Sequence, residues 1–440
     1  MRIRPAALVV VLALVLAACS NSGSSTTASA AKTSGSTAPA GPGGAGGGQT
    51  DGITPTQINV GALVAETGPL GNLYAHLVDG VKAYFDSVNA KGGVFGRQLV
   101  ISKVRDDATN PARSTAQARA LVEEDHVFAV FASSPIFPAG TYLAQRGVPT
   151  FGTNYNNEWD AGPSLFGHNG SFNDAAHLGP FLPWLAGRLG ATVAATVAYT
   201  VASSADCATG QAKAYQKFGI KLGLEDNSLP FGASDVTADI QRMKDAHVGF
   251  VSTCMDPTGN TLVYTGLQKA NLTNVKMYWP NGYDKQTLNN YASQMEGVYF
   301  GLQEVPFEAA ASSPEMQLYM AQMAKVNPGT QIGEESLYGW VVADLFVKGL
   351  QMAGKDATRA TVVDKLNTLT HWTGEGLIPA VDWTRQHHGN GPTDCTAVVQ
   401  VQHARFVPVF NTPDSPFVCF HAPNATTTDT ISPQPYSDVG

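Results

Sequence analysis

The chain has 440 residues, 43% of them hydrophobic, and a formal net charge of −8 at pH 7. This acidic balance, without a basic stripe, gives no support to a nucleic-acid-binding protein. The part with globular composition runs from Ile53 to about His421. It is roughly 370 residues long, which exceeds a single hydrophobic core and predicts two domains.

Residues 1–18 are typical of a signal peptide, because two arginines near the start precede a short apolar run. That run is shorter than the roughly 20 residues that a membrane-spanning helix needs. The sequence LAAC, ending at Cys19, resembles a lipobox, in which the cysteine is lipidated and becomes the mature N-terminus. The alternative is an ordinary cleaved signal with an incidental cysteine. Residues 19–52 are almost all small or polar, so we expect a disordered Gly/Ser/Ala tether.

From Ile58 to Phe131 the pattern predicts β-α-β-α-β. The three expected strands are INVGALV, Gln98–Val104 and VFAVFA. The two expected helices are Tyr74–Asn89 and a helix that Asn110 caps. Such a unit forms a parallel sheet with helices on both faces. Ligands of these sheets lie beyond the carboxyl ends of the strands.

The same alternation continues along the chain. A short helix is expected from Ser134 to Gln145, then the strand VPTFG, a loop, and a mainly helical segment over 172–189 that Pro180 and Pro183 interrupt. A second α/β series follows, with strands over 193–199, 223–229, 248–253, 275–279 and 297–302 and helices between them. Helices over 314–326, 335–352 and 358–369 and a hairpin over 398–410 complete the chain.

The sequences GALVAETGPLG, NAKGGVFGRQL, DDATNPARSTAQARALVEED and VFAVFASS resemble the opening of type I periplasmic solute-binding proteins. The most similar branch is the leucine/isoleucine/valine-binding receptors of ABC importers. The resemblance implies an α/β fold with two doubly wound parallel-sheet lobes joined by a three-strand hinge. It places lobe 1 at residues 53–174 and 302–378, lobe 2 at 175–301 and 379–421, and a flexible tail at 422–440.

The resemblance also implies a function. We expect an exported, lipid-anchored monomer that captures a small organic ligand between its lobes, without a cofactor or a metal, and delivers it to the permease subunits of an ABC importer. A ligand sensor of the same fold is one alternative, and an exported α/β hydrolase is a less favoured one. The motifs HExxH and GxSxG and a Walker loop do not occur in the sequence, so no catalytic residue is nominated.

Polar residues at the expected strand ends are candidate ligand contacts. Ser133 and Ser134 would precede a helix start, where free N–H groups favour an anion, although Ser134 could merely cap that helix. The resemblance places contacts there and at Thr153 and Asn154. In the second lobe it points to Ser204, Asp256, Asn281 and Tyr283, while Tyr74 and Tyr155 could stack on a flat ligand or belong to ordinary packing.

The ligand class depends on one departure from the family. The amino-acid receptors use a second-lobe acid to pair with the ligand ammonium, and here that position aligns with Asn281. Asp256 or Glu66 could replace the acid. We therefore expect a small organic acid, an amide or an aromatic compound rather than leucine, isoleucine or valine.

Four cysteines remain if Cys19 is lipidated, and an even number in an exported protein indicates disulfides. They allow three pairings. We favour Cys207–Cys254, at the carboxyl edge of the second lobe's sheet, and Cys395–Cys419, which flank the terminal hairpin. The alternative is a reactive thiol or a metal site, which the lack of a CxxC motif disfavours.

Overall fold

The computed structural model describes residues 48–68, 71–171, 179–326, 328, 332–387, 395–410, 416–420 and 433–434. The expected signal peptide, Cys19 and most of the expected tether lie outside these residues. In the part that is described, no helix is long and apolar enough to cross a membrane.

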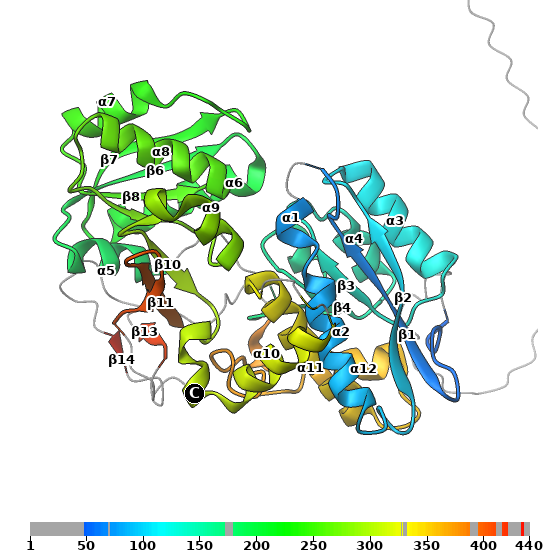
Figure 1. Ribbon diagram of the computed structural model, residues 1–440. Helices are drawn as coiled ribbons and strands as arrows, with labels where there is room; N and C mark the ends of the chain where they lie inside the picture. Colours follow the sequence, from blue (N-terminus) through cyan, green and yellow to red (C-terminus); the bar gives the residue numbers. More distant parts are fainter. Residues whose placement is uncertain are drawn as a thin grey trace, which may run out of the picture. The chain divides into compact units, whose positions relative to one another are not determined.

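The first sheet has five parallel strands in the order β2-β1-β3-β4-β5 (Figure 1). The strands β1 to β4 are those that the sequence predicted, and the order reverses at β1, which lies between β2 and β3. A strand after the loop at 153–164 was not expected, because only Leu165 and Phe166 are apolar between the flanking loop residues. The bounds are β1 (Gln57–Val64), β2 (Gln98–Asp106), β3 (Val130–Ser133), β4 (Thr150–Gly152) and β5 (Leu165–Gly167).

Two layers of helices cover this sheet. Phe131 and Phe346 pack on the face that α2, α11 and α12 cover, and α10 lies against α2. Leu121, Phe137 and Trp159 fill the opposite face, under α3, α4 and the short helix η1. The bounds are α2 (Leu77–Asn89), α3 (Pro111–Glu123), α4 (Ala139–Gln145), η1 (Asn157–Asp160), α10 (Pro314–Val326), α11 (Glu334–Ala353) and α12 (Arg359–Leu366).

Helix starts follow local chemistry. Asn110 caps α3 as expected, because its side chain accepts a hydrogen bond from the backbone N–H of Arg113 over 3.0 Å. The helix expected from Tyr74 is divided into α1 (Gly71–Tyr74) and α2. His76 occupies the N-cap position of α2, and its Nδ1 lies 3.1 Å from the carboxylate of Asp79 in the first turn. A carboxylate in this position stabilises a helix N-terminus.

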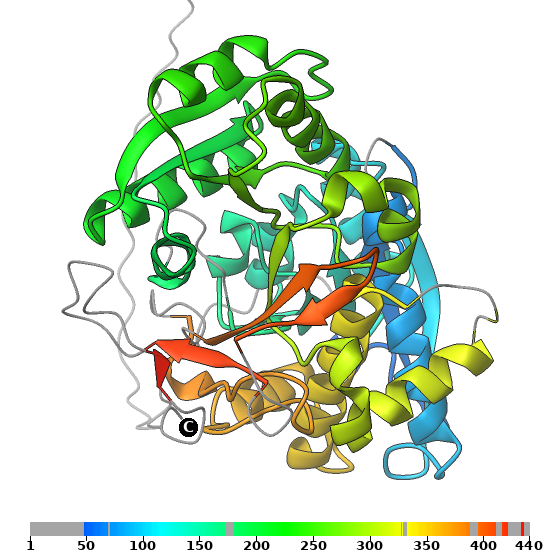
Figure 2. The same ribbon diagram turned by 60° about the vertical axis from the view of Figure 1, so that its left-hand side comes forward.

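The second sheet is mixed, in the order β14-β13-β11-β10-β9-β8-β6-β7. The strands β6 (Val193–Tyr199), β7 (Lys221–Leu229), β8 (Phe250–Cys254), β9 (Lys276–Tyr278) and β10 (Tyr299–Leu302) are parallel. The expected terminal hairpin forms as β11 (Cys395–Val401) and β12 (Phe406–Pro408), antiparallel to each other, with β11 beside β10 (Figure 2).

Two short strands extend this sheet. They are β13 (Val418–Phe420) and β14 (Pro433–Gln434), and both pairings are antiparallel. Residues 433–434 were expected in a loose tail, whereas here they bond to β13. The remainder of that tail lies outside the described residues.

Helices also cover both faces of the second sheet. One face packs against α5 and α6 through Leu185 and Tyr215, and the other against α7, α8 and α9 through Ile240, Val263 and Leu288. The bounds are α5 (Phe181–Arg188), α6 (Ala202–Lys217), α7 (Thr237–Asp245), α8 (Pro257–Lys269) and α9 (Lys285–Met295). Of the helix expected over 172–189, residues 172–178 lie outside the described part.

Both favoured disulfides are confirmed. Cys207 on α6 bonds to Cys254 at the end of β8, and Cys395 on β11 bonds to Cys419 on β13. The second bond joins directly opposed residues of an antiparallel pair. The two bridges therefore reinforce the second sheet at separate places.

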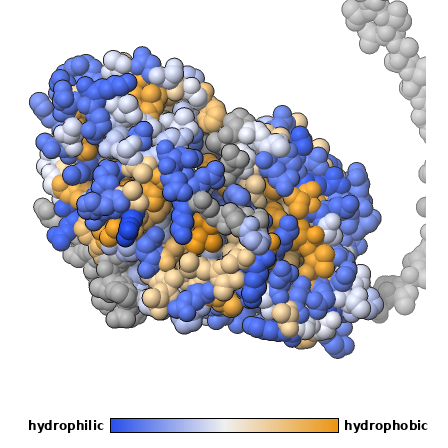
Figure 3. Space-filling view, viewed as in Figure 1, coloured by the Kyte–Doolittle hydropathy of each residue, from blue (hydrophilic) through white to orange (hydrophobic). Residues whose placement is uncertain are grey.

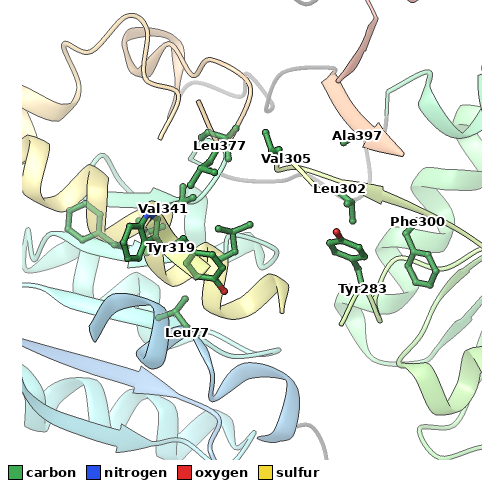
Figure 4. Packing of buried hydrophobic residues seen from close by; sticks show 14 of the residues in the cluster. Leu77, Tyr283, Phe300, Leu302, Val305, Tyr319, Val341, Leu377 and Ala397 are labelled. Carbon is green, nitrogen blue, oxygen red and sulfur yellow. The ribbon is translucent and has the colours of Figure 1, made fainter. Parts of the chain in front are cut away.

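After β10 the chain passes to the helices of the first sheet. The backbone N–H of Val305 donates to the carbonyl of Leu377 over 2.8 Å, so two distant segments meet here. Figure 4 shows Val305 between Leu302 and Leu377. The expected lobe boundaries near residues 302 and 378 lie beside this contact. The first expected passage of the chain from lobe 1 to lobe 2, at residues 174–175, lies outside the described part.

The surface shown in Figure 3 is mostly hydrophilic, with separate hydrophobic areas. The exposed large hydrophobic side chains are well apart in the sequence, and isolated ones are normal on soluble surfaces. They are Phe95, Val104, Val201, Phe231 and Phe410.

Candidate functional site

The expected first-lobe contacts meet a carboxylate of the protein itself. Ser133 ends β3 and Thr153 directly follows β4, and both side chains are buried with their hydroxyls 3.1 Å apart. The Ser133 hydroxyl donates a hydrogen bond to Oε2 of Glu335 over 2.7 Å. Glu335 is half-buried in the first turn of α11. The place where an anionic ligand was expected is therefore next to an acidic side chain.

The helix start expected at Ser134 is wrong. Helix α4 begins at Ala139, and Pro138 takes the N-cap position. Because a proline disfavours helical dihedrals in the residue before it, Phe137 cannot readily join the helix. Ser134 is buried and its hydroxyl accepts a hydrogen bond from the backbone N–H of Ile136 over 3.4 Å. Ser134 therefore does not lie at a helix N-terminus that could bind an anion.

A close crossing of α2 and α11 positions Glu335. A Cβ atom added to Gly80 would lie 1.7 Å from the carbonyl oxygen of Ser336, and one added to Gly339 would lie 2.0 Å from the carbonyl oxygen of Leu77. Only glycines allow the two backbones to approach this closely. The crossing brings the first turn of α11 to the ends of β3 and β4.

Two further glutamates lie beside Glu335. Glu304, just after β10, is fully buried, and Glu334 is half-buried in the first turn of α11. Burial raises the pKa of Glu304 to about 8, and the charge of Glu335 acts in the same direction. Burial likewise raises the pKa of Glu335 to about 8, against the effect of its bond with Ser133. The pKa of Glu334 is raised well above its ordinary value by burial and then by the charge of Glu304.

Aromatic side chains border this acidic cluster, by which we mean Glu304, Glu334 and Glu335. The hydroxyl of Tyr155 donates to that of Tyr338 over 3.4 Å, and Tyr338 donates to Oε1 of Glu334 over 3.3 Å. His168 stacks on Tyr338 with ring centroids 3.9 Å apart and lies edge-on to Tyr155. The His168 ring is fully buried, and neither nitrogen has a hydrogen-bond partner among the described residues.

Two other residues predicted to contact the ligand in the first lobe, Tyr74 and Asn154, lie in different surroundings. Tyr74 ends α1 and is half-buried; burial raises its pKa, with smaller effects from the charges of Glu335 and Asp256. Asn154 is fully buried and donates to the side-chain oxygen of Asn169 over 2.8 Å and to the carbonyl of Gly170 over 3.1 Å. Tyr74 therefore lies near the acidic cluster, whereas Asn154 holds the turn after β5.

The predicted polar residues of the second lobe gather after β6, β8 and β9. Ser204 donates to the carbonyl of Cys254 over 2.5 Å, and Asn281 donates to the carbonyl of Met255 over 3.2 Å. Asp256 caps α8 and accepts a hydrogen bond from the hydroxyl of Tyr199 over 2.6 Å. Each side chain already bonds within the lobe, so this edge is well ordered before any ligand is considered.

Tyr283 lies in the core. It is 1% exposed, stacks on Phe307, and its hydroxyl donates to Glu308 over 2.6 Å. Figure 4 shows it near Leu302 and Phe300. Its packing accounts for the side chain fully. Trp279, directly after β9, is also fully buried.

Sequence reasoning missed Glu304, Glu334, Glu335, His168 and Tyr338. A signal was present for the two helix residues, since GEES places two acids at a helix start without a basic residue nearby in the sequence. Glu304 follows a strand end, as the predicted residues do. No local pattern marks His168, because the strand before it was not recognised.

Comparisons with known proteins follow the same architecture. A model of the family described as periplasmic binding protein matches residues 57–405. A Leu/Ile/Val-binding protein homolog 7 from Brucella suis biovar 1 is 33% identical over 97 residues, covering 21% of this chain and 24% of the relative. The matched part thus spans about a quarter of the length of such curated relatives.

Solved structures match over most of the chain. A fatty acid ABC transporter substrate-binding protein from Thermomonospora curvata has a TM-score of 0.68 at 16% identity, covering 82% of this chain and 93% of that one. A solute-binding protein of an ABC transporter from R. palustris, in complex with benzoate, has a TM-score of 0.65 at 16% identity, covering 80% and 95%. At these identities the similarity concerns the fold.

Proposed function

Because this chain belongs to the periplasmic binding protein family, we propose that it is a lipid-anchored receptor for an ABC importer. The protein is a solute-binding protein of the ABC-transporter type, and its family consists of binding proteins rather than enzymes. In our proposal, the two lobes close on a small organic molecule, and the closed form delivers it to the permease. The family match across both α/β lobes carries the proposal.

Polar groups at the strand ends support ligand binding. In the first lobe Ser133 and Thr153 lie at the carboxyl edge with Tyr155, and in the second lobe Ser204 and Asp256 lie at the corresponding edge. Ligands of open α/β sheets bind at such edges. Closure would exclude water, so that a few hydrogen bonds could determine specificity.

Lipidation at Cys19 would keep the receptor on the outer face of the cell membrane. Cys19→Ala should move the protein from the membrane fraction to the periplasm or the medium, because a cleavage site without the cysteine leaves no lipid attachment. A second variant, Cys207→Ser, provides the control, since this cysteine forms an internal disulfide. Equal membrane association of wild type and Cys19→Ala would contradict the anchor.

Ligand binding is tested on the purified protein by melting shifts across a library of small metabolites. A ligand that binds only the folded state raises the melting temperature of the protein. The shift grows with the ratio of the free ligand concentration to Kd. Hydrolysis of ester, amide and glycoside panels is measured on the same sample. A turnover that persists through purification, without any stoichiometric ligand, would instead establish an exported hydrolase.

A further inference from the structure

The first-lobe site contains an acid where a carboxylate ligand would be held. The Ser133 hydroxyl, which could donate to a ligand carboxylate, donates instead to Glu335 over 2.7 Å. Thr153 is 3.1 Å from the same serine hydroxyl. A ligand carboxylate brought to these hydroxyls would compete with Glu335 for the proton of Ser133, and wherever Glu335 is ionised the two like charges repel each other.

The cluster lacks a positive counterpart. Within the described residues, none of Glu304, Glu334 and Glu335 forms an ion pair with a lysine, an arginine or a histidine. Neither oxygen of the fully buried Glu304 has a partner at hydrogen-bond distance. Buried carboxylates normally have ionic or hydrogen-bonding partners. The backbone N–H of Gln303 and the hydroxyl of Tyr338 are near enough to oppose the rise of its pKa without meeting hydrogen-bond geometry, so Glu304 can still accept bonds from a ligand.

A second feature independently indicates a ligand beside the cluster. The His168 ring is fully buried, and both of its nitrogens are without partners among the described residues. Burial lowers the pKa of His168 to about 3, against a smaller opposite effect of the backbone carbonyl of Gly152, so the ring is neutral and offers one donor and one acceptor. The ring lies against Tyr338 and Tyr155, whose faces can attract a cation.

We propose that the site binds an organic cation whose positive charge lies between the acidic cluster and the ring faces of Tyr155 and Tyr338. This rests on the receptor role proposed above and names the ligand class. Carboxylates beside aromatic ring faces suit an amine, an amidine or a quaternary ammonium, and the proposal is for a cation of this kind. It differs from the organic acid, amide or aromatic compound that the sequence suggested.

Binding is linked to protons. At neutral pH the free site retains protons on carboxyls whose pKa values burial has raised, and a bound cation favours the ionised form. Protons are therefore released on binding, and affinity rises with pH up to about 8, by about tenfold per unit for each proton released. The other titratable groups near these carboxyls are Tyr74, Tyr155, Tyr278, Tyr319, Tyr338, His168 and Asp284, and Asp256 acts on Tyr74.

The test compares ligands of one shape and three charges. Benzamidine, benzamide and benzoate are titrated calorimetrically at pH 6, 7 and 8, in two buffers of different ionisation enthalpy. Putrescine and choline extend the cationic set, and a metabolite library covers the anions and neutral compounds. We expect cations to bind best, benzamidine to exceed benzoate at least tenfold, and protons to be released.

Two isosteric variants locate the charge. Glu335→Gln can keep the bond with Ser133, and Glu304→Gln keeps the side-chain volume; each should weaken the best cation at least tenfold and flatten its pH dependence. The matched control is Glu124→Gln, at an exposed glutamate whose partner is Arg105, which should bind as wild type does. Melting curves confirm that each variant folds.

The possible results separate the two proposals. Tighter binding of benzoate or of any anionic or neutral compound than of every cation overturns the cation inference and leaves the receptor intact. The inference also fails if cation binding survives both glutamine substitutions unchanged. If no member of the library binds, the receptor proposal itself fails.

Discussion

Replacing Gly80 with alanine tests whether the crossing of α2 and α11 builds the site. The new Cβ would lie 1.7 Å from the carbonyl oxygen of Ser336 and 2.9 Å from the backbone nitrogen of Trp340. Real Cβ contacts essentially never fall below 3.0 Å, so the helices must separate by about 1.3 Å, the difference between 3.0 and 1.7 Å. Both obstructing atoms belong to the backbone and cannot rotate away.

Two opposing effects determine how much Gly80→Ala changes the free energy of unfolding. Alanine in a helix is favoured over glycine by about 1 kcal/mol. Overpacking typically costs about 1–3 kcal/mol, and the separation also loosens contacts of buried neighbours such as Leu77 and Val341. Because the obstructing atoms belong to the backbone, we take the upper end of this cost, about 3 kcal/mol; less the gain of about 1 kcal/mol, Gly80→Ala should lower the free energy of unfolding by about 2 kcal/mol. For a domain of this size that corresponds to roughly 4–8 °C in melting temperature.

The assay combines thermal unfolding with ligand titration. The separation should also move Glu335 away from Ser133, so affinity for the best ligand should fall together with stability. Gly266→Ala in α8 is the matched control, because its Cβ would meet only side-chain atoms of Ile240 and Val236, the nearest at 2.8 Å. A Gly80→Ala protein that melts and binds as wild type does would refute the reasoning.

Two further predictions concern stability. Because burial raises the pKa of Glu304 to about 8, the folded protein holds a proton that the unfolded chain loses near pH 4.5. The melting temperature of the ligand-free protein should therefore fall as pH rises from about 5 to 8, and Glu304→Gln should reduce this fall. An equal fall in the variant and the wild type would contradict the role of Glu304. Removing the Cys207–Cys254 bond, which closes a separation of 47 residues, by the double change to serine should lower the free energy of unfolding by about 4 kcal/mol in denaturant titrations. An unaltered denaturation midpoint would show that the bridge adds nothing.

Local chemistry determined much of the fold. Alternation of apolar runs and helical periodicity predicted β1 to β3, α3 and the five parallel strands of the second sheet, since each pattern reports which side chains must be buried. Asn110 capped α3 because a cap depends on neighbours three residues away. The Cys207–Cys254 pair followed from their common place at the carboxyl edge of the sheet, and the Cys395–Cys419 pair from their positions on either side of the terminal hairpin. The strand β5 was missed, because its two apolar residues, Leu165 and Phe166, lie between loop residues without a longer apolar run.

The composition of the site was decided by the tertiary structure. Ser133 and Thr153 could be placed at a strand edge from the sequence, but their neighbour Glu335 is separated from Ser133 by 202 residues. That neighbour depends on where α11 packs on α2, and the close approach of Gly80 and Gly339 sets this position. The raised pKa values of Glu304 and Glu335 depend in turn on burial by segments distant in the sequence. Residue types and the periodicity of apolar residues specify strands and helices. The charge of the site depends instead on which segments, distant in the sequence, can pack closely against each other.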